Sequence, residues 1–244
     1  ADTLEGGLGA DIIAGGEGAD TILGGEGSDQ IAGDAGSDTI VGGLGADTIS
    51  GGSGDDAISG GEGADQIAGD AGSDTIVGGL GADTIDGGEG IDEIDYSTDA
   101  AAGGDAGVTV DLDAGTATDG FGDSDTLSNI ENITGTGESD QLTGSNDANV
   151  IAGNAGDDYI VGGIGSDTID GGEGSDVVDY STDAAIAAAA AAKLLARTSA
   201  KSIAEEEFTV AVEMKNLSQS ELVTATRNAA SALSVLTEKT DLRD

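Results

Sequence analysis

Aspartate recurs at a nine-residue spacing through much of the chain, each time shortly after glycine. Carboxylate oxygens held at a fixed spacing suit a hard divalent cation, and calcium takes about six to eight oxygen ligands. Residues 1–192 contain no Lys, Arg or His, so no basic side chain there can neutralise these carboxylates. The pattern therefore predicts several bound calcium ions with these side-chain ligands: Asp11, Asp20, Asp29, Asp38, Asp47, Asp56, Asp65, Asp74, Asp83, Asp92, Asp140, Asp158, Asp167 and Asp176.

Each aspartate closes a glycine-rich segment whose main-chain carbonyls can supply further oxygens. The unit at 6–14 reads Gly-Gly-Leu-Gly-Ala-Asp-Ile-Ile-Ala, and ten such units follow one another without a gap through residue 95. Position eight is Ile in every one of them. Candidate carbonyl ligands lie on the first glycine of a unit, such as Gly15, Gly24, Gly42, Gly51, Gly60, Gly78, Gly162 and Gly171.

The elements that must position these oxygens follow from the same nine residues. Three residues centred on each Ile suit a short strand with the middle side chain inward, and the glycine-rich six suit a turn. Strand, turn, strand and turn make one coil of 18 residues. Stacked coils then form two parallel sheets with ladders of Ile between them. The sequence predicts an all-β solenoid of Gly-Gly-x-Gly-x-Asp-x-Ile-x repeats, followed by an α-helical C-terminal segment.

Four segments are expected along the chain. The first repeat block covers 1–95, an irregular and partly β spacer covers 96–134, a second repeat block covers 135–183, and a helical tail covers 184–244. In the spacer, residues 108–112 alternate as a strand does, and residues 126–133 are expected to resume the coil. Asp123 and Asp125 either hold a further ion or belong to a solvated acidic loop.

The repeats depart from their pattern at a few positions. Asp34, Asp70 and Asn154 replace the second glycine of a unit, and Asn149 replaces an aspartate. Thr136 and Glu138 alter the unit just before Asn149. Calcium sites that flank Asn149 are therefore expected to be weak or empty.

Over residues 1–183 this pattern resembles the RTX (repeats-in-toxin) family, whose calcium-binding nonapeptide has the same glycines and aspartate. The resemblance implies a right-handed parallel β-roll with calcium in its turns. It also implies export by a type I secretion system, and therefore an extracellular location.

Composition narrows the possible activities. The formal net charge is -42, and an acidic surface repels nucleic acid and anionic lipid. The chain has no His and no Cys, so nucleophile–histidine catalysis within it is excluded. No apolar run reaches the ~18 residues that a membrane span needs. We expect no enzyme activity, no nucleic-acid partner and no membrane span in this chain.

The tail differs in character from the repeats. It carries all seven basic residues, and an apolar stripe at helical spacing runs through Leu222, Ala225, Ala229, Leu233 and Leu236. Two interpretations stay open, an export signal and an assembly segment that makes homo-oligomers or binds neighbouring surface subunits. The basic residues favour assembly. If the roll itself makes the contact, the better candidate is the edge with Leu8, Leu44 and Leu80, spaced 36 residues apart.

These patterns favour a calcium-dependent structural module of a secreted or cell-surface protein, such as an adhesin, surface-layer or filament subunit. The alternatives are the non-catalytic part of a secreted protease, lipase or toxin, and a component of a virion fibre.

Overall fold

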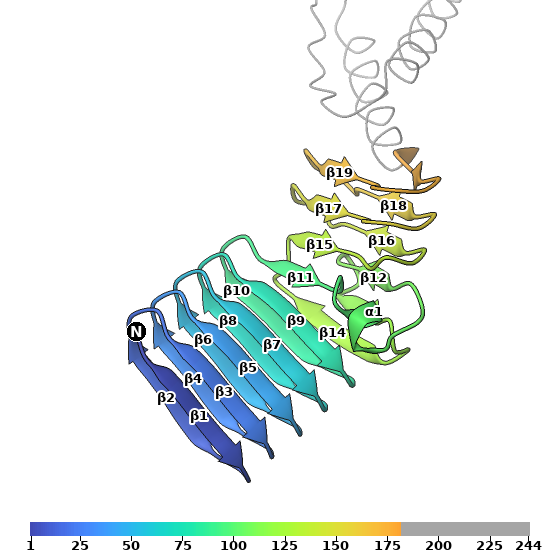
Figure 1. The fold of residues 1–244 in the computed structure, drawn as a ribbon. Helices are drawn as coiled ribbons and strands as arrows, with labels where there is room; N and C mark the ends of the chain where they lie inside the picture. The colour runs from blue at the N-terminus through green and yellow to red at the C-terminus, as the bar shows by residue number, and fades with distance from the viewer. Residues whose placement is uncertain (182–244) are drawn as a thin grey trace, which may run out of the picture. The chain divides into compact units, whose positions relative to one another are not determined.

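The computed structural model describes residues 1–181, which wind into stacked coils that form two sheets (Figure 1). One sheet has nine strands in the order β1-β3-β5-β7-β9-β11-β15-β17-β19. The other has eleven, in the order β2-β4-β6-β8-β10-β14-β13-β12-β16-β18-β20. No helix in this part of the chain is long and apolar enough to cross a bilayer. The expected helical tail, 184–244, lies outside the described residues. The export and assembly roles expected of it therefore stay predictions.

Ten strands of equal length form the first block, and they alternate between the two sheets. Each is followed by a short turn that ends on an aspartate of the nine-residue repeat. They are β1 (Thr3–Leu8), β2 (Ile12–Glu17), β3 (Thr21–Glu26), β4 (Gln30–Ala35), β5 (Thr39–Leu44), β6 (Thr48–Ser53), β7 (Ala57–Glu62), β8 (Gln66–Ala71), β9 (Thr75–Leu80) and β10 (Thr84–Glu89).

The register confirms the 18-residue coil. In the parallel pair of β3 and β5, Ile22 lies opposite Ile40, and in the pair of β5 and β7, Ile40 lies opposite Ile58. These three side chains are at most 2% exposed, and together with the Ile of the facing sheet they form the core. The predicted parallel solenoid with inward Ile ladders is therefore confirmed for the described residues.

The expected strand length was wrong for the first block, where strands have six residues rather than three. Burial alternates beyond each Ile to the first glycine of the next unit, as in Ile49 and Gly51 of β6. Pairing therefore continues through both glycines, because neighbouring coils have the same backbone path. Three-residue strands do occur in the second block, in β16 (Gln141–Thr143), β17 (Val150–Ala152), β18 (Tyr159–Val161) and β19 (Thr168–Asp170), before the two-residue β20 (Val177–Val178).

The spacer forms a short antiparallel meander inside the second sheet. Strand β14 (Ser124–Ser128) pairs parallel with β10 and antiparallel with β13 (Thr116–Thr118). Strand β13 pairs antiparallel with β12 (Thr109–Asp111), and β12 pairs parallel with β16. In the first sheet, β11 (Glu93–Asp95) pairs directly with β15 (Asn132–Thr134). Both sequence expectations for the spacer, a strand near 108–112 and a return to the coil at 126–133, are confirmed.

Larger side chains fill the interior at the spacer. The second sheet gains β12 and β13 here, while the first sheet gains no strand. Tyr96 follows β11 and is 2% exposed, and it packs in the core with Val108, Val110 and Leu127. One helical turn, α1 (Asp99–Ala102), follows Tyr96.

Three of the non-glycine residues at the second unit position adopt the same backbone conformation as the glycines they replace. Asp34, Asp70 and Asn154 have φ of 71°, 72° and 71°, in the left-handed region. Asp and Asn tolerate this region better than other residues, so the coil keeps its path at these positions.

Candidate metal centres

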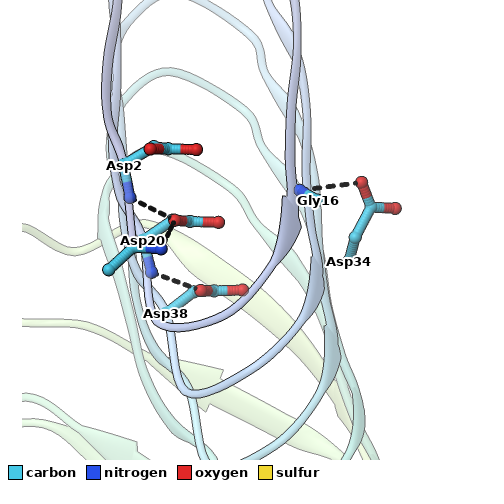
Figure 2. A network of polar contacts seen from close by, with 6 residues as sticks. Asp2, Gly16, Asp20, Asp34 and Asp38 are labelled. Carbon is cyan, nitrogen blue, oxygen red and sulfur yellow. Dashed lines mark hydrogen bonds and ion pairs between the residues drawn. The ribbon is translucent and has the colours of Figure 1, made fainter.

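Aspartates from successive coils form a row along each edge of the roll. The main-chain N–H of each donates to Oδ1 of the aspartate one coil further on, as Asp20 does to Asp38 at 2.7 Å (Figure 2). The other row repeats this bond, and Asp29 donates to Asp47 at 2.8 Å. The side chains are almost fully buried, with Asp38 and Asp47 each 2% exposed. One oxygen of each carboxylate therefore ties two coils together.

The second oxygen of nearly every regular aspartate has no hydrogen-bond partner. Buried polar atoms are normally paired, so a repeated unpaired carboxylate oxygen requires a ligand that the protein does not itself supply. The Oδ2 atoms of these residues are buried and unpaired: Asp11, Asp20, Asp29, Asp38, Asp47, Asp56, Asp65, Asp74, Asp83, Asp92 and Asp158.

A main-chain carbonyl from the next coil lies beside these oxygens in the regular region. A Cβ built on Gly24 would lie 2.6 Å from Oδ2 of Asp29 and 2.5 Å from the carbonyl oxygen of Gly42. On Gly60 it would lie 2.5 Å from Oδ2 of Asp65 and 2.6 Å from the carbonyl oxygen of Gly78. Only glycine leaves this space open. Carboxylate and carbonyl oxygens from two coils thus converge at one place.

The carboxylates repel one another when no cation is bound. Charges one strand spacing apart, about 4.8 Å, repel by roughly 3–4 kcal/mol at an effective dielectric constant near 20. Burial, together with the neighbouring aspartates, raises the pKa of Asp65 and of Asp74 to about 6. Burial raises the pKa of Asp47, Asp56 and Asp92 as well. A cation between the coils would remove both the repulsion and the burial penalty.

The donor set fits calcium. In residues 1–181 no group of three or more acidic side chains is placed to hold a metal ion by itself. An ion here would combine few carboxylate oxygens with several carbonyl oxygens, and calcium accepts such mixed and irregular oxygen shells. Zinc prefers nitrogen and sulfur ligands, and the chain has no His or Cys.

The predicted aspartate ligands at the ends of the roll are less buried than those in its middle. Asp11, Asp167 and Asp176 are only half-buried, whereas the regular aspartates between Asp20 and Asp92 are buried. The aspartate that corresponds to the predicted carbonyl of Gly15 is Asp2 in the preceding coil, and Asp2 is exposed. The other predicted carbonyls lie beside the first glycine of the preceding coil, as described for two of them above: Gly24, Gly42, Gly51, Gly60, Gly78, Gly162 and Gly171.

The second block binds some of its carboxylate oxygens internally. Thr136 donates its main-chain N–H to Oδ2 of Asp140 at 2.7 Å and its hydroxyl to Oδ1 at 2.8 Å. Asn149 is 1% exposed, and its Nδ2 donates to the carbonyl oxygen of Glu131 at 2.6 Å. Threonine in place of the second glycine, and asparagine in place of an aspartate, thus leave fewer oxygens for an ion. That the sites flanking Asn149 are weak or empty stays a prediction.

Two spacer residues continue the rows, although the repeat pattern did not place them there. Asp83 donates its N–H to Oδ1 of Asp125 at 3.0 Å, and Asp92 donates to Oε2 of Glu131 at 2.8 Å. Asp125 is 3% exposed, whereas Asp123 is exposed, so the solvated-loop interpretation applies to Asp123 alone. The signal for Asp125 was the run at 125–127, Asp-Thr-Leu, which has the Asp-x-apolar order of a repeat unit.

The comparison with protein families agrees with this geometry. The family model of the RTX calcium-binding nonapeptide repeat matches residues 1–31, 32–67, 59–94, 125–160, 134–169 and 143–178, which is more than half of the chain. A search of curated proteins found no match. Repeats of this kind bind multiple calcium ions. A parallel roll of Gly-Gly-x-Gly-x-Asp units with rows of unpaired carboxylate oxygens, matched by that family model in both blocks, places this chain in the RTX calcium-binding nonapeptide repeat family.

Proposed function

We propose that this chain is a calcium-dependent structural module of a secreted or cell-surface protein, and that it folds when it binds extracellular calcium. The observation that carries the proposal is the pair of aspartate rows. Eleven regular aspartates bury an Oδ2 that has no partner, and residues 1–192 contain no basic side chain. Such rows are stable only when cations neutralise them.

In this proposal each ion lies between successive coils of one edge. The repeat aspartates whose Oδ2 is unpaired supply that oxygen, and in the regular region the first glycine of the next coil supplies a carbonyl oxygen. Asp29 with Gly42 and Asp65 with Gly78 are the pairs that define this arrangement, and the regular units from Asp11 to Asp74 repeat it. Every ion then binds two coils at once, so ion binding and folding are the same event.

An extracellular setting follows from the ligand set. A site with few carboxylates binds calcium weakly, in the range of about 10⁻⁴ to 10⁻³ M that is typical of extracellular modules. Calcium at this level is present outside cells and absent from the cytosol. The chain would therefore stay unfolded during export and fold after it leaves the cell. A role as part of an adhesin, a surface layer or a filament fits a solenoid that presents long repetitive faces.

The first test is a calcium titration of the full chain followed by circular dichroism. The signal should change from coil to β between about 10⁻⁴ and 10⁻³ M calcium, and EGTA should reverse the change. Magnesium at the same concentration is the control, because it demands a regular octahedral shell and keeps its water. A chain that is equally β-structured in excess EGTA at neutral pH would contradict the proposal. For location, the source cells are separated into cytosol, surface and medium, and the parent protein is traced with an antibody.

A further inference from the structure

The meander of the spacer brings five strand ends to the edge of the roll that carries Asp83. Strand β10 begins after Asp83, β14 has Asp125 as its second residue, β13 ends before Asp119, and β16 begins after Asp140. Strand β12 begins just after Val108, whose N–H donates to Oδ1 of Asp140 at 2.7 Å. The meander therefore continues the edge on which the regular row runs.

Two further buried carboxyl groups lie in this stretch. Asp119 is 1% exposed, and its Oδ1 accepts the N–H groups of Phe121 at 3.0 Å and Asp123 at 2.7 Å. Its Oδ2 is buried and has no hydrogen-bond partner. Asp99 is 2% exposed, and its Oδ2 accepts the N–H of Gly120 at 3.0 Å. Neither residue belongs to a nine-residue unit.

These groups are close enough to act on one another. The charge of Asp119 contributes to the raised pKa of Asp83, Asp99 and Asp125, after the larger effect of burial in each case. The hydrogen bond from the N–H of Asp83 to Oδ1 of Asp125 extends the acidic row into the meander, and Asp119 lies in the loop that joins β13 to β14. The row of carboxylates is not interrupted where the repeats are.

The oxygen that normally accompanies a repeat aspartate is missing at Asp83. Beside Gly78, Oδ2 of Asp83 lies 2.5 Å from the point where a Cβ would be, but the other two nearest atoms are Cδ1 of Ile85 and the carboxyl carbon of Asp83 itself. No glycine carbonyl of a following coil reaches this point. The reason is that β9 pairs with β11, and Tyr96 follows β11 where a repeat unit would have its first glycine. Asp83 thus has an unpaired Oδ2 without its usual neighbour, and the nearby Asp119 has another.

We propose that the spacer holds a divalent-cation site of its own, with Oδ2 of Asp83 and Oδ2 of Asp119 as its carboxylate ligands. Main-chain carbonyls and water complete the shell, since no three acidic side chains in residues 1–181 are placed to do so. A carboxylate here replaces the carbonyl of a repeat site. The greater ligand charge makes this site bind calcium more tightly than the repeats do. The ion connects the last coil of the first block to the meander that leads into the second.

The test compares Asp119→Asn with Asp123→Asn in the full chain. Asparagine at 119 keeps an oxygen acceptor for the two N–H groups and removes only the charge. Asp123 is exposed in the same loop and its charge also acts on Asp83, but it has no buried unpaired oxygen, so its substitution removes an equal charge without removing a ligand. Calcium-induced β structure is followed by circular dichroism, and the number of bound ions by equilibrium dialysis.

The direction in which Asp119→Asn shifts the calcium midpoint shows whether an ion is bound beside Asp119. If an ion is bound, Asp119→Asn raises the calcium midpoint by about twofold, since one ion of many is lost, and it binds one ion fewer. Asp123→Asn leaves the number of bound ions unchanged. If no ion is bound, Asp119→Asn only relieves repulsion among buried carboxylates, and its midpoint falls or stays the same. That result, with an unchanged ion count, overturns the proposal.

A second measurement keeps the acidic cluster intact and does not depend on how the variant folds. In a chain with Tyr159→Phe and Tyr180→Phe, Tyr96 is the only tyrosine left, and burial beside Asp99, Asp119 and Asp125 raises its pKa. Terbium replaces calcium and emits when a nearby tyrosine is excited. Emission should reach its plateau with the first equivalents of terbium. Emission that grows in step with all bound ions would overturn the proposal.

The inference rests on calcium binding by the roll, but it can fail separately. If Asp119 binds no ion, both variants still gain β structure on adding calcium, and the proposed function stands. If the wild-type chain itself shows no response to calcium, the proposed function fails first.

Discussion

The main-chain N–H of Asp29 donates to Oδ1 of Asp47 at 2.8 Å, while Oδ2 of the same Asp47 has no hydrogen-bond partner. The two oxygens of one carboxylate thus do different things. Oδ1 connects two coils directly, and Oδ2 remains for a cation. A substitution that removes one of these two roles and keeps the other can therefore distinguish the contribution of the hydrogen bond between coils from that of calcium binding.

Replacing Asp47 by Asn and by Ala should give two different losses. Asp47→Asn keeps an acceptor for the N–H of Asp29 but loses the charge, so it should bind less calcium and fold at higher calcium. Asp47→Ala also leaves that buried N–H unpaired, which costs about 1–3 kcal/mol more. Calorimetry gives the number of ions, and urea unfolding in saturating calcium gives the stability.

Asn149→Ala serves as the control for calcium loss, because Asn149 has no charge and its Nδ2 already donates to Glu131. It should lose fewer calcium ions than Asp47→Ala. Equal losses of bound calcium in the two variants would show that intact neighbouring repeats do not matter.

Gly60→Ala should block a repeat site by volume alone. The new Cβ would lie 2.5 Å from Oδ2 of Asp65 and 2.6 Å from the carbonyl oxygen of Gly78, in the space proposed for an ion. Calcium affinity and stability should both fall. Gly137→Ala is the matched control, since nothing lies within 4 Å of its Cβ, and it should change stability by no more than about 0.5 kcal/mol. Similar effects of the two substitutions on the calcium midpoint would contradict the placement of the site.

The calcium-free chain should be more structured in acid than at neutral pH. Burial raises the pKa of Asp65 and Asp74 from 3.8 to about 6, and of Asp125 to about 7. A carboxyl group with a higher pKa in the folded state holds its proton more tightly there. Its contribution is complete below about pH 4 and is lost as the pH rises towards 7.

Circular dichroism of a chain freed of metal by dialysis checks this dependence. The β signal should increase as the pH is lowered from about 8 to about 5. In saturating calcium the trend should reverse, because protons then compete with the ions for the same oxygens. A metal-free chain with more β structure at the higher pH would show that the buried carboxyl groups do not govern folding.

Tyr96→Phe should destabilise the spacer. The hydroxyl of Tyr96 donates to Oδ2 of Asp125 at 3.0 Å, and both residues are buried. Losing this donor leaves a buried carboxylate oxygen unpaired, at a cost of about 1–3 kcal/mol. Tyr159→Phe removes a comparable bond to Asp179, but at an exposed position, and should cost little. Thermal unfolding of both variants in saturating calcium compares them, and equal midpoints would argue against a structural role for the Tyr96 bond.

Most of the regular roll could be predicted from the repeat, for a local reason. Each unit contains its own strand, its own turn and its own carboxylate, and neighbouring coils place identical residues in register. Ile40 therefore lies between Ile22 and Ile58, 18 residues away on either side. The spacing of the aspartates sufficed to place Asp29 and Asp47 in one row for the same reason.

Strand length and the spacer depended on contacts between coils. Gly51 joins β6 because the coils on both sides follow the same path, and no propensity of glycine for strands would indicate this. Asp119 and Asp83 are 36 residues apart and share no repeat, and they come near each other only because β13 and β14 form an antiparallel hairpin beside β10. In a periodic sequence, the period determines which residues of adjacent coils become neighbours. In the spacer, where the nine-residue period is lost, the neighbours of a carboxylate depend on which strands pair. That pairing depends in turn on how the side chains of the spacer pack with Tyr96 in the core.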